Sequence, residues 1–248
     1  MNFLGTCRVP HTGGWQAWSS FEAEIKPIEG TKTLCLVFVE VNHGPFMVDN
    51  NLLLSSASLL DVSEGGAYVH NLFAGQIRMF PELRRDTPYH SAHTTELAGL
   101  CNTRGGDDRF YNNVFAGGNG LSPYDNAALP MRMAGNVYLK GANPSTQDQD
   151  ACIPPQFDPG IELIESKEAL YLRLDLDEAW ARETSRQLVT TGSPGRAKIP
   201  DLPYERPDGS AYRIDTDYFG KTRHADGPFP GPFEHVGRGK HQLRVWPH

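Results

Sequence analysis

The stretch Tyr111-Asn112-Asn113-Val114-Phe115-Ala116 places an asparagine directly before a short apolar run. Three other segments carry the same pattern, with Asn51, Asn71 and Asn136 in the position of Asn113. The four asparagines lie 20, 42 and 23 residues apart, so the middle interval is about twice the others. A repeat of this length, built from strand-forming residues and turns, is typical of a solenoid. The repeat therefore predicts a parallel β-helix in which each coil stacks on the next.

An asparagine at one recurring position also predicts an internal ladder. Each carboxamide can donate to one neighbouring coil and accept from the other, which satisfies buried polar groups. The double interval between Asn71 and Asn113 should hold either one coil without the asparagine or a long excursion. We expect Thr94 to Leu100 to form the strand of that coil. Residues 76–93, rich in Arg, Pro, Tyr and His, are expected to protrude as a loop.

The rest of the chain is also predicted to be mostly β. Residues 1–41 read as strands, including the continuous apolar run at 33–39. Residues 42–145 hold the coils, and the polar, Pro-rich stretch 143–160 is typical of a linker. Residues 146–248 contain two strands, at 160–165 and 169–176, and then many prolines. The expected architecture is an incomplete right-handed parallel β-helix with β-sandwich segments packed against it.

Composition narrows the classes of function. The chain has 248 residues and a net charge of −7, with no basic run, which argues against a nucleic-acid partner and suits a neutral ligand such as a sugar. Its four cysteines are scattered and form no C-x-x-C pair, so a zinc ribbon or redox motif is not expected. No apolar run has the length of a membrane span. The N-terminus lacks the basic start and apolar core of a signal peptide. We expect no cofactor.

The acidic stretch Gly105-Gly106-Asp107-Asp108-Arg109 stands directly before the aromatic strand residues 110–115. Carboxyl groups at the mouth of a rigid strand are where a hydrolase would hold its catalytic acids. Arg109 beside the two aspartates would keep one of them ionised, as a nucleophile requires. The structural alternative is that the aspartates only cap an Asx-type turn.

A first resemblance concerns the N-terminal strands. The segment TGGWQAW at 12–18, followed by LCLVF at 34–38, resembles the closing part of a family 6 carbohydrate-binding module, which is a β-sandwich. The resemblance implies that Trp15 stacks on a sugar ring, and an indole face suits that contact. Alternatively, Trp15 and Trp18 belong to the core of the sandwich.

A second resemblance runs from about residue 40 to the end. It is carried, in this order, by NHGPFMVDNN, EGGAYVHNLFAG, TPYHSAHTTELAGL, GGDDRFYNN, AGNVYLKGA, DLDEAWA, AKIPDLPYE and IDTDYFGK. These segments resemble the C-terminal part of glycoside hydrolase family 120. The resemblance implies a β-xylosidase-type enzyme with a parallel β-helix intertwined with a β-sandwich, and a cytoplasmic or periplasmic location. The N-terminal coils of that family have no counterpart here.

The resemblance also implies catalytic residues. A retaining glycosidase needs a nucleophile and an acid/base carboxyl about 5–5.5 Å apart, and neighbouring coils lie about 4.8 Å apart. The nucleophile corresponds to Asp107 or Asp108; we favour Asp108, because Asp107 is better placed as a turn cap. The family's acid/base glutamate lies about one coil later, but residues 129–134 contain no carboxylate.

Three other carboxylates could take that role: Asp125, Glu64 and Glu96. We favour Glu96 because three residues suited to sugar binding precede it, namely Tyr89, His90 and His93. The alternative is that Glu96 is an ordinary surface residue. The H-x-x-H-x-x-E spacing would suggest a metal on a helix, but Pro88 and the β context argue against one, so we expect no metal.

The predicted function is therefore hydrolysis of xylosides or similar short oligosaccharides, with Asp108, Asp107 and Glu96 as catalytic candidates. Tyr89, His90, His93, Arg109 and Trp15 are the candidate substrate-binding residues. The alternatives are a non-catalytic carbohydrate-binding or structural β-solenoid and a polysaccharide lyase, since lyases also use β-helices. The sequence leaves oligomerisation open.

Overall fold

The computed structural model describes residues 40–94, 96–177, 179–180, 185–206, 208–234 and 236–247. The segment that resembles a carbohydrate-binding module, with Trp15 and Trp18, lies outside the described residues.

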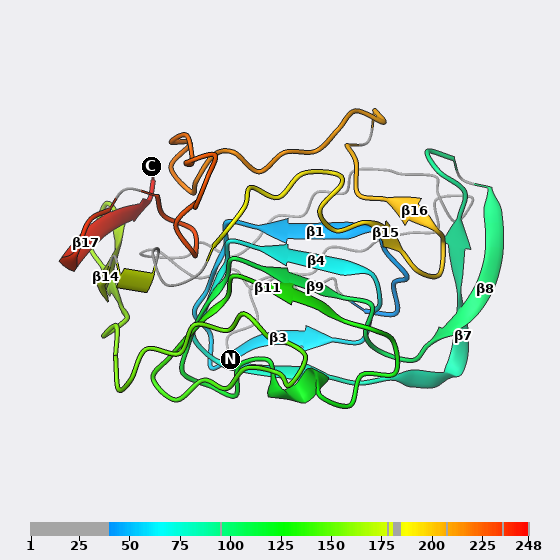
Figure 1. Ribbon diagram of the computed structural model, residues 1–248, viewed down its shortest axis with the longest axis horizontal. Helices are drawn as coiled ribbons and strands as arrows, with labels where there is room; N and C mark the ends of the chain where they lie inside the picture. Colours follow the sequence, from blue (N-terminus) through cyan, green and yellow to red (C-terminus); the bar gives the residue numbers. More distant parts are fainter. Residues whose placement is uncertain are drawn as a thin grey trace.

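The described chain is a parallel β-helix, as the asparagine repeat predicts (Figure 1). Successive coils add one strand each to stacked parallel sheets. The first sheet is formed by β1 (Phe46–Asp49), β4 (Gly66–Val69), β9 (Arg109–Tyr111) and β11 (Arg132–Ala134). The second sheet is formed by β2 (Leu52–Leu53), β5 (Leu72–Phe73), β10 (Val114–Ala116) and β12 (Val137–Leu139). The third sheet contains β3 (Ala57–Asp61) and β6 (Gln76–Met79), and the short 3₁₀-helix η1 (Ser122–Tyr124) lies against β6.

The asparagine ladder (Asn51, Asn71, Asn113 and Asn136) is confirmed. The side-chain amides of Asn51, Asn71 and Asn113 each donate to the carboxamide oxygen of the next asparagine at 3.1 Å. The same oxygens accept the backbone N–H of the preceding asparagine at 2.9–3.0 Å. The ladder therefore pairs buried backbone groups at the corner where the first sheet turns into the second, and it fixes the register of the coils.

Aromatic side chains stack inside the coils beside this ladder. Tyr68 lies over Phe110 with ring centroids 4.7 Å apart. Phe73, Phe115 and Tyr138 follow one another at 5.0 Å. These spacings are close to the distance between stacked strands, so the two stacks of aromatics run from coil to coil through the interior.

The double interval between Asn71 and Asn113 is an excursion and not a coil. Leu72 on β5 pairs directly with Val114 on β10, which leaves no room for a coil between them. The intervening chain forms an antiparallel hairpin of β7 (Glu82–His90) and β8 (Leu97–Thr103) at one end of the coils (Figure 1). Of the two alternatives left open for this interval, the structure shows the long excursion. The prediction that Thr94 to Leu100 form the strand of a coil is wrong, because β8 pairs with β7 and not with a neighbouring coil.

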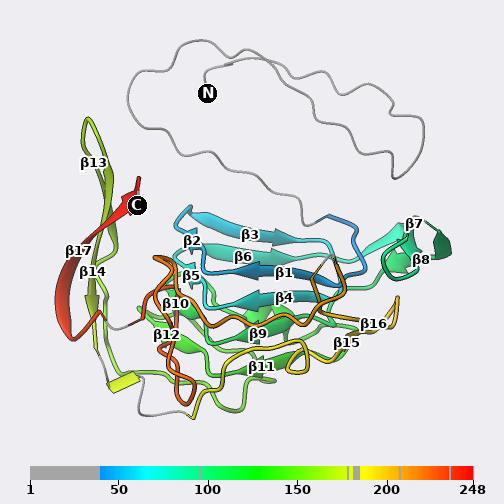
Figure 2. The same cartoon turned by 90° about the horizontal axis from the view of Figure 1, so that it is seen from above.

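The C-terminal part packs on the coils in two places. The antiparallel sheet of β13 (Glu162–Glu165), β14 (Leu170–Leu176) and β17 (Gly239–Trp246) stands beside the second sheet (Figure 2). Their shared core includes Val114 and Leu139 from the coils and Leu174 and Val245 from the C-terminal sheet. The two strands predicted around the turn before residue 169 are thus present.

A second C-terminal segment covers the outer face of the first sheet. It contains the hairpin of β15 (Arg196–Ala197) and β16 (Leu202–Pro203). Its apolar residues pack on Ala67 and Val69 of β4: Val189, Ala197, Tyr204 and Ile214. Among the described residues, no helix is long and apolar enough to cross a membrane.

Candidate active site

Asp107 and Asp108, in the turn before β9, point to opposite sides of the coil wall. Phe110 is stacked inside the coils, so Asp108, two residues earlier, also points inward, whereas Asp107 and Arg109 point outward. Asp108 has no exposed surface, and its Oδ1 accepts the backbone N–H of Gly66 at 2.9 Å. Asp107 has a φ of +57° and lies on the outer side of the coil wall, where the residue is only 6% exposed.

Both carboxylate oxygens of Asp107 are held. Oδ1 lies 2.8 Å from the Arg109 guanidinium, and Oδ2 accepts the backbone N–H of Lys198 at 2.6 Å. The side chain keeps 8% of its surface exposed. Burial raises the pKa of Asp107 above its ordinary value, while Lys198 N–H and Arg109 act in the opposite direction. Arg109 thus favours the ionised form as expected, but its effect on the pKa is outweighed by burial.

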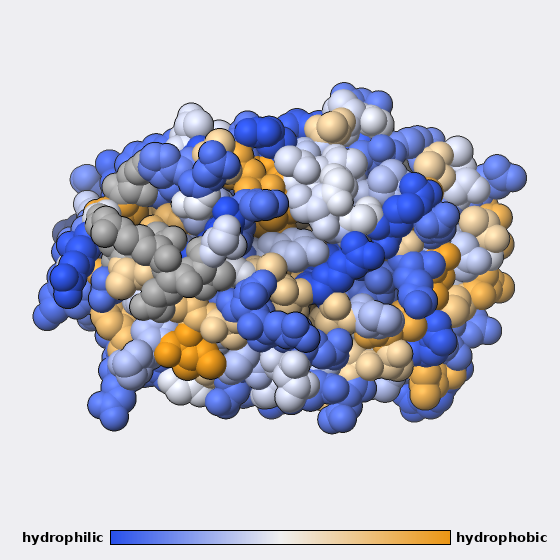
Figure 3. Space-filling view, viewed as in Figure 1, coloured by the Kyte–Doolittle hydropathy of each residue, from blue (hydrophilic) through white to orange (hydrophobic). Residues whose placement is uncertain are grey.

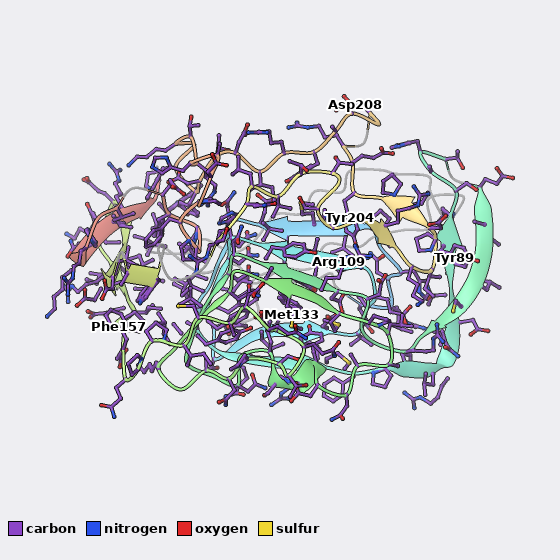
Figure 4. All side chains as sticks on the ribbon, in the orientation of Figure 1. Tyr89, Arg109, Met133, Phe157, Tyr204 and Asp208 are labelled. Atoms are coloured by element: carbon purple, nitrogen blue, oxygen red, sulfur yellow. The ribbon has the colours of Figure 1, made fainter. Side chains whose placement is uncertain are left out.

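Arg109 donates hydrogen bonds to the C-terminal segment around β15, which covers Asp107. Its side chain is buried and donates to the carbonyl oxygens of Pro194 at 2.9 Å and Arg196 at 2.6 Å. It also donates to the carbonyl of Asp107 and lies 5.1 Å from the centre of the Tyr204 ring (Figure 4). These donors are used within the chain, so the structure places Arg109 as a partner of Asp107 and not as a group facing a ligand.

The inward aspartate belongs to a buried acidic pair. Asp61 and Asp108 are neighbouring buried carboxyls; Tyr124 donates its hydroxyl to Asp61 at 2.7 Å, and Asp108 Oδ2 has no hydrogen-bond partner among the described residues. Burial raises the pKa of Asp61 to about 6. Burial, with the neighbouring charge of Asp61, raises the pKa of Asp108 well above its ordinary range. Two neighbouring carboxyls buried inside the coils cannot both be ionised, so the pair keeps a shared proton.

This pair predicts a dependence of stability on pH. The folded protein holds a proton on Asp61 up to about pH 6, whereas the unfolded chain releases it near the ordinary value of 3.8. The contribution of Asp61 to stability is therefore full below pH 4 and is lost as pH rises through 6. We expect the unfolding free energy of the wild type, relative to Asp61→Asn, to fall by about 2 to 3 kcal/mol between pH 4 and 7. Urea unfolding of both proteins across this range measures it, and a difference that is constant or rises with pH would contradict the shared proton.

The hairpin carries the other predicted site residues. The ring of Tyr89 meets that of His43 edge-on at 6.1 Å. The Nδ1 atom of His90 is buried and has no hydrogen-bond partner among the described residues. His93 Nε2 lies 2.7 Å from Glu205 Oε1, which ties the hairpin tip to the segment that follows β16. Glu96 is exposed at that tip.

No metal-binding group is formed by these side chains. Within the described ranges, no three His, Cys, Asp or Glu residues are grouped as a metal ion would need.

The positions one coil away from Asp107 hold no carboxylate. Arg109 pairs with Ala67 on one side and Arg132 on the other, which places Gly65 and Pro130 beside Asp107. Two of the other candidates for the acid/base role are also turned away. Glu64 is fully buried, and Asp125 accepts hydrogen bonds from the backbone and hydroxyl of Thr146 in a surface loop.

Neither of two hollows in the described structure touches Asp107. An apolar cavity of about 20 Å³ between the coils and the C-terminal sheet is lined only by apolar residues, including Leu72, Trp180 and Phe233. A shallow polar hollow lies at the β13–β14 turn, around Lys167 and Arg244. In the view of Figure 1, strongly hydrophilic side chains form a diagonal band across the surface (Figure 3).

Three residues of the site were not predicted from the sequence. Lys198 and Tyr204 lie in AKIPDLPYE, and His43 lies in NHGPFMVDNN. Both segments carry the resemblance described above, but no local pattern in them indicates a role for these three residues. Their partners are 91, 139 and 21 positions away in the chain. The only local signal was that His43 and Tyr204 stand next to turn-forming glycine and proline residues.

Fold and site together define a parallel β-helix protein in which both carboxylate oxygens of Asp107, on an outward-facing turn, are held by Arg109 and Lys198. No protein-family model and no curated protein matches the sequence. A solved structure described as "The complex structure of XylC with xylose" is similar to this chain, with 32% sequence identity and a TM-score of 0.77. The similarity covers 84% of this chain and 37% of that one, so the chain spans well under half the length of XylC.

Proposed function

We propose that the chain is part of a glycoside hydrolase that acts on xylosides or similar short oligosaccharides with retention of configuration. The observation that carries the proposal is the 32% identity, over 84% of the chain, to a protein solved with xylose bound. The Asp107 carboxylate, which points outward from the coils and keeps 8% of its side chain exposed, adds a group of the required chemistry.

In the proposed mechanism Asp107 is the nucleophile, in place of the sequence-based preference for Asp108. Asp108 is enclosed in the coils, and its raised pKa favours the neutral form, which cannot attack. A carboxylate oxygen of Asp107 would attack the anomeric carbon while a second carboxyl group gives its proton to the departing oxygen. Water, deprotonated by that second group, would then release the sugar and restore Asp107.

We propose Glu96 as the second carboxyl group, with Tyr89, His90 and His93 as sugar-binding residues. The support is the position of the hairpin. His93 bonds to Glu205, and β16 belongs to the same covering segment as Lys198, which holds Asp107 (Figure 1). Residues one coil from Asp107 supply no alternative, because Gly65 and Pro130 occupy those positions.

The test is covalent trapping of the purified chain with a 2-fluoro-β-xylosyl fluoride. Fluorine beside the anomeric carbon slows release of the sugar, so a retaining enzyme accumulates the glycosyl ester. We expect intact-mass spectrometry to show one sugar per chain and peptide mapping to place it on Asp107. A folded chain that takes up no label and does not hydrolyse p-nitrophenyl β-xyloside would refute the enzyme proposal.

One observation favours a second candidate, a non-catalytic sugar-binding or structural solenoid. Both oxygens of Asp107 are already bonded and its nearest coil positions lack a carboxylate, as in a site that only fixes the covering segment. Binding of xylo-oligosaccharides without hydrolysis would support this candidate. Eliminative cleavage of a uronic-acid polymer would instead point to a lyase.

A further inference from the structure

The acidic turn (residues 104–108) has an unusual backbone. Three consecutive residues have positive φ: +84° at Gly105, +103° at Gly106 and +57° at Asp107. A Cβ atom at Gly106 would lie 2.5 Å from the carbonyl oxygen of Leu129, so only glycine fits there. Asp107 has a side chain and adopts the left-handed conformation nonetheless. Such a conformation persists only where the surroundings hold it.

Glu64 supplies that hold from the neighbouring coil. It forms a parallel bridge with Gly106 and has no exposed surface. Its Oε1 accepts the backbone N–H of Arg104 at 2.6 Å and that of Gly105 at 3.3 Å. The carboxylate therefore pairs the two amides that open the acidic turn, and buried amides left unpaired would favour another path of the chain.

The other oxygen of Glu64 reaches the hairpin through His43. Glu64 Oε2 lies 3.1 Å from His43 Nδ1. His43 Nε2 lies 2.9 Å from the Thr87 hydroxyl on β7 and 3.0 Å from the Cys101 carbonyl on β8. One buried carboxylate thus contacts both the turn that presents Asp107 and, through one imidazole, both strands of the hairpin that carries Tyr89.

We infer that Glu64 is a positioning residue: it fixes the acidic turn so that Asp107 points outward, and it locks the hairpin to that turn. This inference rests on the proposed role of Asp107 as nucleophile. Glu64 does not touch the sugar, because it is enclosed beneath the turn. Glu64 affects the direction of the Asp107 side chain, so a change at Glu64 should alter the chemical step more than substrate binding.

The test compares Glu64→Leu, which removes both acceptors, with Glu64→Gln, which keeps one. The matched control is Glu82→Gln, since Glu82 sits on the same hairpin and its carboxylate contacts only Arg84 among the described residues. With p-nitrophenyl β-xyloside, we expect Glu64→Leu to lower kcat by about 100-fold with KM changed by less than about 3-fold, because small misplacements of a reacting group cost about that much. Glu64→Gln should recover roughly 10-fold of this loss.

Amide hydrogen exchange gives a readout that does not need activity. We expect the Arg104 and Gly105 amides to exchange at least about 10-fold faster in Glu64→Leu, while the amides of the asparagine ladder keep their protection. An inactive wild type refutes the proposed function. An active wild type whose kcat is unchanged in Glu64→Leu, or unchanged exchange at residues 104–105 in either case, overturns the positioning role. Loss of protection throughout the coils would also overturn it, because Glu64 would then serve overall stability.

Discussion

Asp107→Asn should lose nearly all hydrolysis of p-nitrophenyl β-xyloside, with kcat lowered on the order of 10⁴-fold, as when other enzymes lose their nucleophile. An amide has the size of the carboxylate but cannot attack the anomeric carbon. The substitution also removes the ion pair with Arg109 while leaving an oxygen that can accept the N–H of Lys198. The fold should therefore persist, and circular dichroism should match that of the wild type.

The matched variant is Asp108→Asn, which changes the adjacent carboxyl group in the same way. Asp108 is enclosed and accepts the backbone N–H of Gly66, so we expect a change in kcat of less than about 10-fold. The fluoro-sugar label should appear in Asp108→Asn and be absent in Asp107→Asn. Loss of labelling only in Asp108→Asn would show that the coil wall opens and that the inward aspartate is the nucleophile.

Asn113→Ala is expected to cause the largest loss of stability. Asn113 is fully buried at the centre of the asparagine ladder. Its oxygen accepts from the backbone and side chain of Asn71, and its amide donates to Asn136 and to the carbonyl of Tyr68. Alanine would leave several of these groups buried and unpaired, each at a cost of about 1 to 3 kcal/mol. We expect unfolding free energy to fall by about 3 to 4 kcal/mol in total, since the coils relax in part.

Asn51→Ala provides the control at the end of the ladder. Asn51 is only partly buried and bonds to one asparagine, Asn71, so water can replace part of what is lost. A loss of about 1 kcal/mol is expected. Urea unfolding monitored by circular dichroism measures both variants. Equal losses at Asn51 and Asn113 would mean that the ladder contributes no more than any polar contact on the coils.

The largest part of the fold was predictable because its signals are local and periodic. The spacing of Asn51, Asn71, Asn113 and Asn136 predicted both the coils and the ladder, since each coil must place an amide at the same corner. The hairpin was only half predictable. The long interval required either an excursion or an extra coil. Nothing local told whether the residues of β8 pair with β7 or with a coil, because both pairings use the same strand-forming residues.

The candidate site depended more on tertiary structure. Side chains alternate between the two faces of a strand, so Asp108 lies on the same face as Phe110. Had the stack of Phe110 on Tyr68 been predicted first, Asp108 could have been assigned to the interior from the sequence. The partners of Asp107 could not be found this way. Lys198 meets it only because the chain returns over the first sheet 91 residues later, whereas Arg109 is its neighbour in the sequence.

The sequence by itself determined a parallel β-helix with an asparagine ladder and an acidic turn opening an aromatic strand. These follow from residue types repeated at coil length. Only the tertiary structure decided which aspartate faces outward, what holds it, and that Glu64 and His43 join the acidic turn to the hairpin. Those outcomes depend on backbone direction at three left-handed residues and on contacts between distant segments, and neither property is carried by any local stretch of the chain.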